Sequence, residues 1–338
     1  MNQNADFLLN NCGPIIRYLI SKRSDASDPD FLKPYYKEVL KSPEVSYWKS
    51  KIPTTVEVST VLGSSDSCFE NSFAKLLWYE LATEDIVTKQ QLNNYLRFLE
   101  NRQNSTIYDW LARYVVAGYL FASGYLDEKV TEMVKKRIDV IYDFVVNSPL
   151  KYNIHAAQYK GKKAVRSELY TGYELVLPLI YDVFIFYYIY DRVSSSLRKK
   201  IQKIVEYIAD DRYQSLDYGY GLVKTKDNRT HFMGWSAHLP FYNDALSIPY
   251  FNKFLIQRMI LFSRFDDPKI NVWLGKMKKK LENFKISDDK YNIPSEFLTE
   301  KKNVYFLTGG HMRLGEPRKK RNSRIVESTF FGWSLKSS

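Results

Sequence analysis

The segment with the greatest potential for chemistry is DYGYGLVKTKDNRTHFMGWSAHLPFYND, residues 217–244. It concentrates aromatic side chains, histidines and glycines in a stretch without helical periodicity. Asp217 and His238 in this segment, and Glu316 nearer the C-terminus, carry side chains that can act as general acids or bases. We take these three residues as candidate catalytic groups for acid–base chemistry, such as protonation of an alkene or hydrolysis of a sugar.

Aromatic and cationic side chains near these groups are candidates for ligand contacts. Aromatic rings bind the apolar faces of ligands, and Gly219, Gly221 and Gly234 permit tight turns or the close approach of a ligand. The candidate ligand-binding residues are Tyr218, Tyr220, His231, Phe232, Trp235, Tyr242, His311 and Arg313. Two interpretations are open: the aromatic residues line a cavity, or they close one end of the hydrophobic core.

The sequence predicts no metal site and no cofactor, with zinc and magnesium as the open alternatives. The four histidines all fall in irregular segments: His155, His231, His238 and His311. The spacing of seven positions between His231 and His238 matches no known ligand motif, and Cys12 and Cys68 form no CxxC pair. We expect the histidines to form hydrogen bonds within the loops.

Two further patterns are interpreted as structural. Asp210 and Asp211 are adjacent carboxylates next to Arg212, which is typical of the end of a surface helix. The segment TGGHMRLG matches neither a phosphate-binding loop nor a dinucleotide motif, so we interpret it as a turn that leads into a solvated basic loop.

The composition predicts a folded, basic protein. Among 338 residues are 27 Tyr, 20 Phe and 6 Trp, too many large hydrophobic side chains for a disordered chain. The formal net charge of +12 suits an anionic partner such as nucleic acid, and the run from Arg318 to Arg324 is the best candidate contact. Because the basic residues are otherwise spread along the chain, we do not favour a nucleic-acid partner.

The N-terminus and the apolar segments predict a cytoplasmic protein. The N-terminal stretch lacks a basic region followed by an apolar run, and two cysteines form no disulfide framework. The most apolar segment, ELVLPLIYDVFIFYYIY, is interrupted by Pro178 and Asp182. We therefore expect a buried helix there and no membrane span.

Helical periodicity dominates the chain and predicts an all-α fold. Apolar residues recur at helical spacing after Thr88, Asp127 and Ser194, each of which is a favoured helix N-cap. An apolar stretch precedes each of these amphipathic helices, so the chain repeats one helical hairpin. We find no run of alternating residues that would predict a strand.

Long irregular segments follow the amphipathic helices and are rich in aromatic residues: 147–172, 210–248 and 285–324. Equivalent connections in a stack of hairpins emerge at the same end. We therefore expect one domain, residues 1–338, with these loops gathered at one end. A ring of hairpins around a central cavity and an open α-solenoid both fit this pattern.

Parts of the chain resemble a known family. FLLNNCGPIIRYLISKR with SPEVSYWKSKIP after it, DDRYQSLDYGYGLVKTKDNRTHFMGWSAHLP, and RIVESTFFGWSL are similar to landmarks of uncharacterised prenyltransferase-like or squalene-cyclase-like proteins of bacteria and archaea. The resemblance spans nearly the whole chain and implies the α/α toroid of terpenoid cyclases and protein prenyltransferases. The acid motif DxDD and the magnesium motif DDxxD are absent, and the cysteines lie far from the histidines. No catalytic residue of the family is therefore carried over.

Three functions follow as expectations. The first is a toroid that binds a small or elongated organic ligand, including an isoprenoid, in an aromatic cavity, with acid–base chemistry if it is an enzyme. The second is a carbohydrate-active toroid that uses a pair of carboxylates. The third is a scaffold without catalysis that binds nucleic acid or another anion through its basic surface.

Overall fold

The structure is a computed structural model that describes residues 3–24, 29–100, 106–159, 161–224, 230–243, 251–288, 290–317 and 322–336. It is mostly helical, as the periodicity predicts. The helices are α1 (Gln3–Asn11), α2 (Pro14–Ser24), α3 (Pro29–Leu40), α4 (Pro43–Lys51), α5 (Val58–Val61), α6 (Phe69–Trp78), α7 (Thr83–Ile86), α8 (Lys89–Glu100), α9 (Ile107–Ala122), α10 (Glu128–Asn147), α11 (Ile180–Ile189), α12 (Ser195–Ile208), α13 (Asp211–Gln214), α14 (Phe251–Phe262), α15 (Pro268–Glu282) and α16 (Ser323–Lys336), with 3-10 turns η1 (Ser167–Tyr173) and η3 (Phe306–Thr308).

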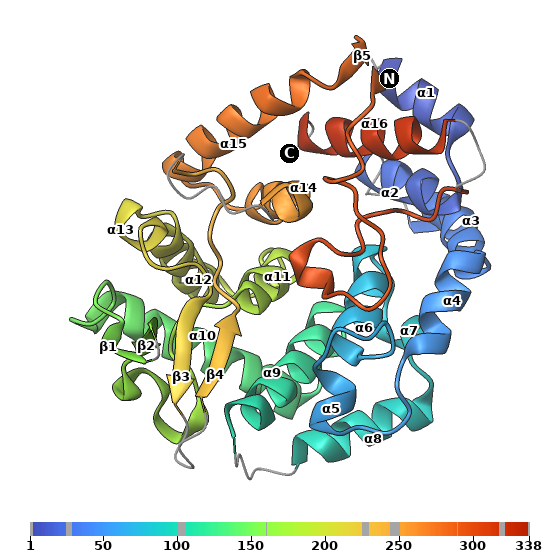
Figure 1. Ribbon diagram of the computed structural model, residues 1–338. Helices are drawn as coiled ribbons and strands as arrows, with labels where there is room; N and C mark the ends of the chain where they lie inside the picture. Colours follow the sequence, from blue (N-terminus) through green and yellow to red (C-terminus); the bar gives the residue numbers. More distant parts are fainter. Residues whose placement is uncertain are drawn as a thin grey trace.

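The helices form an inner and an outer row (Figure 1). Helices α6, α9, α11, α14 and α16 lie toward the middle, and α8, α10, α12 and α15 lie outside them. Every side chain of α6 is buried, whereas α10 buries mainly one face, which includes Val130, Val134 and Ile138. The apolar stretches of the sequence therefore become inner helices, and the amphipathic stretches become outer helices.

Side-chain caps begin the outer helices where the sequence predicts them. Thr88 and Gln91 form a reciprocal capping box at α8. Asp127 accepts hydrogen bonds from the first turn of α10, and Ser194 accepts one from α12. Asp267 caps α15 in the same way, at a position that was not among the predicted caps.

The two ends of the chain meet. Helix α1 contacts α16, which is the last helix. The backbone N–H of Gly13 donates to Glu316 Oε1 at 2.5 Å, and the guanidinium of Arg23 donates to the Ser334 hydroxyl. The N-terminal and C-terminal segments are therefore joined by direct contacts.

The prediction that the chain contains no strands is wrong. Strands β1 (His155–Tyr159), β2 (Lys162–Val165), β3 (Tyr220–Lys224) and β4 (Thr230–Gly234) form one sheet in that order. The outer pairs are antiparallel, and β2 meets β3 in parallel at a single residue pair, Ala164 and Leu222. A second, two-stranded sheet contains β5 (Lys285–Ser287) and β6 (Lys290–Tyr291). These strands are too short to show a clear alternating pattern.

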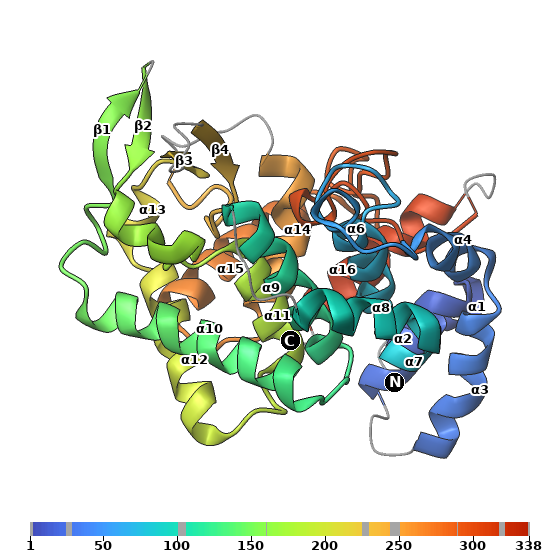
Figure 2. The same cartoon turned by 90° about the horizontal axis from the view of Figure 1, so that it is seen from below.

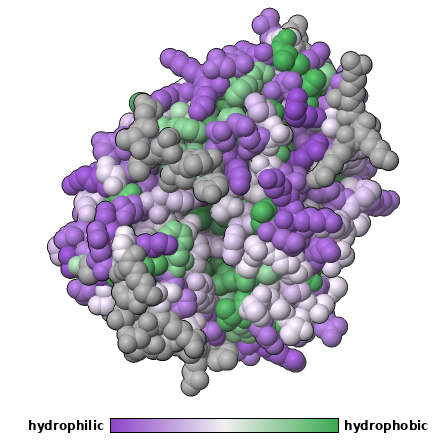
Figure 3. All heavy atoms as spheres, viewed as in Figure 1, coloured by the Kyte–Doolittle hydropathy of each residue, from purple (hydrophilic) through white to green (hydrophobic). Residues whose placement is uncertain are grey.

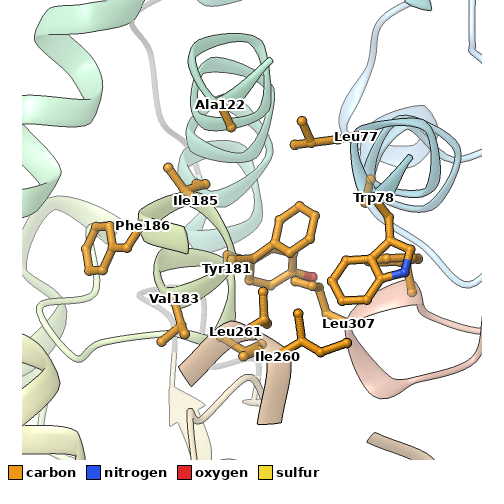
Figure 4. Packing of buried hydrophobic residues seen from close by; sticks show 14 of the residues in the cluster. Leu77, Trp78, Ala122, Tyr181, Val183, Ile185, Phe186, Ile260, Leu261 and Leu307 are labelled. Carbon is orange, nitrogen blue, oxygen red and sulfur yellow. The ribbon is translucent and has the colours of Figure 1, made fainter. Parts of the chain in front are cut away.

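The sheet β1–β4 and the C-terminal loop before α16 lie on the same side of the helices (Figure 2). This is the end at which α6, α9 and α11 begin, and we call it the loop end. Buried hydrophobic side chains fill the space between the inner helices. Figure 4 shows some of these buried side chains, among them Trp78, Tyr181 and Leu307; the ring of Phe306 lies 5.9 Å from that of Trp78 and 5.6 Å from that of Phe184. Among the described residues, none of the helices has both the length and the apolar character needed to cross a bilayer.

Replacement of Gly221 by alanine is expected to destabilise the protein. Its φ is +88°, and a Cβ atom would lie 2.4 Å from the backbone oxygen of Lys163 on β2. We expect Gly221→Ala to lower the free energy of unfolding by about 1–3 kcal/mol, measured by urea denaturation. Gly275→Ala is the control, because this glycine lies in exposed helix α15 with no neighbouring atom within 4 Å. It should raise stability by up to about 1 kcal/mol, and equal effects of the two changes would contradict the prediction.

Candidate functional site

A cavity of about 440 Å³ opens at the loop end. It lies between α5 and the first turns of α6, α9 and α11, and Trp235, which follows β4, lies along one side. Figure 3 shows a hollow with hydrophobic side chains in this part of the surface. The residues that line the cavity are Glu57, Val58, Ser59, Leu62, Gly63, Glu70, Tyr108, Leu111, Tyr181, Trp235 and Tyr305. Its walls are therefore mainly aliphatic and aromatic, with few polar groups.

Glu70 is the buried acid of this cavity, with only 3% of its surface exposed. It accepts hydrogen bonds from the Gly63 N–H at 2.5 Å and from the Tyr181 hydroxyl. Burial raises the pKa of Glu70 to about 7, although the two hydrogen bonds oppose the increase. A carboxyl group with this pKa exchanges its proton near neutral pH, as a general acid or base requires.

Aromatic rings form one side of the cavity. The ring of Tyr108 meets that of Trp235 edge to face at 5.7 Å. On another side, Tyr108 meets the imidazole of His231 at 4.9 Å. His231 therefore supports a ring that lines the cavity, while Trp235 lines the cavity itself.

Three other candidate residues of the 217–244 segment lie away from this cavity. Phe232 is 56% exposed, and Lys162 Nζ lies 5.4 Å from its ring. Asp217 is half-buried and forms an ion pair with Lys163 at 3.0 Å. The Tyr242 hydroxyl donates to Asp211 at 2.5 Å and lies 3.2 Å from the Ala209 carbonyl oxygen. None of these three is among the residues that line the 440 Å³ cavity.

His238 is buried and has both ring nitrogens engaged. Its Nε2–H donates to the Leu216 carbonyl at 3.0 Å, and its Nδ1 accepts from the Ser236 hydroxyl at 2.8 Å. Burial lowers the pKa of His238 to about 4, so the imidazole is neutral at physiological pH. This geometry supports the hydrogen-bonding role expected of the loop histidines rather than proton transfer to a ligand.

Tyr218 and Tyr220 belong to the cluster around His238. The Tyr220 side chain is fully buried, and its hydroxyl donates to the Pro178 carbonyl at 2.5 Å while accepting from Tyr213 at 2.6 Å. The ring of Tyr218 lies 5.8 Å from that of His238. Trp235 therefore lines the cavity, whereas the cluster around His238 closes part of the hydrophobic core. The cavity interpretation holds for one part of the segment and the core interpretation for the other.

The C-terminal candidates take part in other interactions. His311 lies 3.0 Å from a carboxylate oxygen of Glu300, and Arg313 forms an ion pair with Glu327 at 2.7 Å. Glu316 binds the backbone of Gly13, as described above. The Glu316 contact joins the last loop to the N-terminal segment, whereas the other two contacts lie within the C-terminal segment. None of the three candidates lines the cavity beside Glu70.

Asp210 follows the end of α12 and pairs with Arg212, as interpreted from the sequence, but it also begins the next helix. It caps α13 and forms an ion pair with Arg212 at 2.9 Å. The hydrogen bonds from Arg212 lower the pKa of Asp210 to about 2. Residues 318–321, the centre of the basic run, lie outside the described residues.

Sequence reasoning missed Glu70, Tyr108 and Tyr181. They lie in the first turns of three inner helices and are far apart in the chain. One signal was present: α6 carries Glu70, Asn71 and Lys75 although all of its residues are buried. Polar side chains on a helix without an exposed face need partners or a function.

A larger cavity, about 1020 Å³, lies where α6, α9 and α11 end, opposite the loop end. Several of its charged side chains form ion pairs with one another, including Lys22 and Arg23 with Glu80, at 2.7 and 3.8 Å. The nearby cations lower the pKa of Glu80 despite its burial. We therefore place the candidate site at Glu70, the carboxyl group whose pKa lies near neutrality.

Within the described ranges, no three His, Cys, Asp or Glu side chains converge in a way that could hold a metal ion. Comparison of the chain with protein-family models, with curated proteins and with solved structures finds no match. A proposal for the function therefore depends on the geometry of the site.

Proposed function

We propose that the protein is an α/α toroid that binds an organic ligand in the cavity beside Glu70 and that Glu70 exchanges a proton with this ligand. The observation that carries the proposal is a buried carboxyl group with a pKa of about 7 in an aromatic cavity. The two rows of helices, the repeated hairpins and the contact between α1 and α16 support a closed toroid over an open solenoid.

The walls of the cavity define the class of ligand. Leu62, Leu111 and Val58 offer aliphatic surface, and Tyr108 and Trp235 offer aromatic edges and faces. A volume of about 440 Å³ lies within the usual range of roughly 300–1,000 Å³ for small-molecule sites. We propose a neutral, mainly apolar ligand, with an isoprenoid as the class that the family resemblance implies.

Two neighbouring groups hold the Glu70 carboxyl group. Tyr181 donates a hydrogen bond to Glu70 when the carboxyl group is ionised, and Gly63 holds the other side through its N–H. Protonated Glu70 can donate to an electron-rich double bond or to an oxygen of the ligand, and its ionised form can accept a proton. Tyr181 and Gly63 therefore orient the carboxyl group and support its charge.

Binding can be tested with farnesol as a neutral isoprenoid probe, with native mass spectrometry of the purified protein as a search for a bound natural ligand. We expect Trp235→Ala to weaken farnesol binding about tenfold, because it removes a large apolar wall. Phe232→Ala is the matched control on β4, since its ring is exposed and lies outside the cavity. Equal losses in the two variants would contradict the proposed site.

The role of Glu70 is tested separately once the ligand is known. Glu70→Gln keeps the size of the side chain but cannot transfer a proton. We expect turnover to fall at least about a hundredfold while ligand affinity stays within a few fold. Unchanged turnover would contradict the acid–base role and leave the binding role standing.

A second candidate function is hydrolysis of a sugar bond, because two carboxylates, Glu57 and Glu70, line the same aromatic cavity. Glu57 is exposed, and Glu70 is buried with a raised pKa, a difference that suits a base and an acid. A panel of nitrophenyl glycosides tests this function. It requires hydrolysis that both Glu57→Gln and Glu70→Gln abolish, and an effect of Glu70→Gln alone would favour the first proposal.

A further inference from the structure

Two of the most deeply buried cationic side chains have both a carboxylate partner and backbone acceptors. Lys75, Arg137 and Arg258 each expose 2% of their surface or less. Lys75 bonds to Glu300 at 3.1 Å and to two backbone carbonyls. Arg137 bonds to both oxygens of Asp182, at 3.0 and 2.8 Å, and also to two carbonyls. Each of these cations therefore has a carboxylate and backbone acceptors, as buried charges require.

Arg258, on the inner helix α14, differs from both. Its guanidinium donates to the neutral side-chain oxygen of Gln257 at 3.2 Å, and its Nε has no hydrogen-bond partner among the described residues. It forms no ion pair with any residue in the described ranges. Burial lowers the pKa of Arg258 to about 10, so the side chain still carries its charge at neutral pH.

The surroundings of Arg258 are aromatic and contain a free donor. The guanidinium lies 5.3 Å from the ring of Phe254, and the Tyr218 ring stacks on Phe254 at 6.1 Å and 11°. Tyr218 is half-buried, and its hydroxyl has no hydrogen-bond partner in the part of the chain that the structure describes. The nearby imidazole of His238 is neutral, so it supplies no negative charge.

A buried guanidinium without an anion is costly, because it loses its hydration and gains no counter-charge. Arginine binds carboxylate and phosphate through its planar set of N–H donors, and a phenol can add a further hydrogen bond. We propose that Arg258, with the Tyr218 hydroxyl, binds the oxyanion of a small ligand, either a carboxylate or a phosphate. This site is independent of the function proposed for Glu70.

Thermal unfolding of the full chain tests the site. The Tm is measured in inorganic phosphate or in acetate and compared with the Tm in chloride at the same ionic strength. We expect at least one of the two oxyanions to raise the Tm of the wild type by about 3 °C or more. Arg258→Met should abolish the specific increase, leaving only the general salt effect of phosphate. Lys163→Met is the control, because it removes a half-exposed cation near β3 and should keep the full increase.

Two outcomes identify the anion and two overturn the site. A larger increase with phosphate assigns a phosphate group, and a larger increase with acetate assigns a carboxylate. Equal increases in the wild type and Arg258→Met, or no increase in the wild type with either anion, would overturn the proposal.

Stability without added anion gives a second measurement. Because Arg258 has no carboxylate to leave unpaired, Arg258→Met should have a Tm no lower than that of the wild type in chloride. Arg258→Lys keeps the charge but loses the planar donors, and Tyr218→Phe loses the hydroxyl. Both should bind the preferred anion at least about tenfold more weakly in isothermal titration, and unchanged affinity in both would also overturn the site.

Discussion

Arg137→Met lowers the free energy of unfolding by about 3–5 kcal/mol, the largest effect that we expect from a single substitution in this chain. The change removes the guanidinium and leaves the carboxylate of Asp182 buried with 0% exposure and without its counter-charge. Asp182 also accepts the backbone N–H of Leu179 at 2.5 Å at the start of α11. The pair therefore joins outer helix α10 to inner helix α11 and to the capping contacts of α11.

Urea denaturation measures this loss, and two further variants show its cause. Arg137→Met combined with Asp182→Asn should recover part of the stability, because no unpaired charge remains. Lys129→Met is the matched control on α10, since Lys129 forms a 3.0 Å ion pair with Glu100 but is 62% exposed. It should cost less than about 1 kcal/mol. A loss of that small size in Arg137→Met would contradict the assigned role of the buried pair.

Glu70 makes stability depend on pH, with a sign opposite to that of most carboxylates. Its pKa in the folded protein is about 7, against an ordinary value of 4.5. The folded state therefore holds the proton more tightly than the unfolded state. The contribution of this group is fully present below pH 4.5 and is lost as the pH rises to about 7. We expect a loss of about 3 kcal/mol over this interval.

The comparison with Glu70→Gln isolates this group from the other titrating residues. The stability of the wild type relative to that of Glu70→Gln should fall by about 3 kcal/mol between pH 4.5 and pH 7.5, measured by urea denaturation at each pH. Tyr181→Phe is a second variant, because it removes the hydroxyl that stabilises the ionised form. It should raise the pKa of Glu70 further. A constant difference across the pH range would show that the carboxyl group titrates normally.

Local signals were sufficient to predict the helices. Thr88, Asp127 and Ser194 cap the helices that follow them, and buried residues recur where the apolar periodicity places them. A cap and a helical face depend on residues within about one or two turns of the chain, so both can be identified without tertiary structure.

Strand pairing was not predictable in the same way. Strand β3 pairs with its neighbour β4 and also with β2, from which η1, α11, α12 and α13 separate it in the chain. Tyr220 lies in β3 with a φ of +67°, so even its backbone departs from an ordinary strand. Pairing between distant segments depends on how the helices bring them together, and short strands carry little pattern of their own.

The sequence by itself determined the helical class and the caps of several helices, and it named Trp235 as a candidate ligand contact. Only the tertiary structure decided that Glu70, Tyr108, Tyr181 and Trp235 share one cavity, that His238 is neutral and fully bonded, and that Arg258 is buried without a carboxylate. The physical reason is that helix formation is governed by near neighbours in the chain. Burial and the loss of hydration, which set the pKa of Glu70 and the need of Arg258 for an anion, arise only when distant segments pack together.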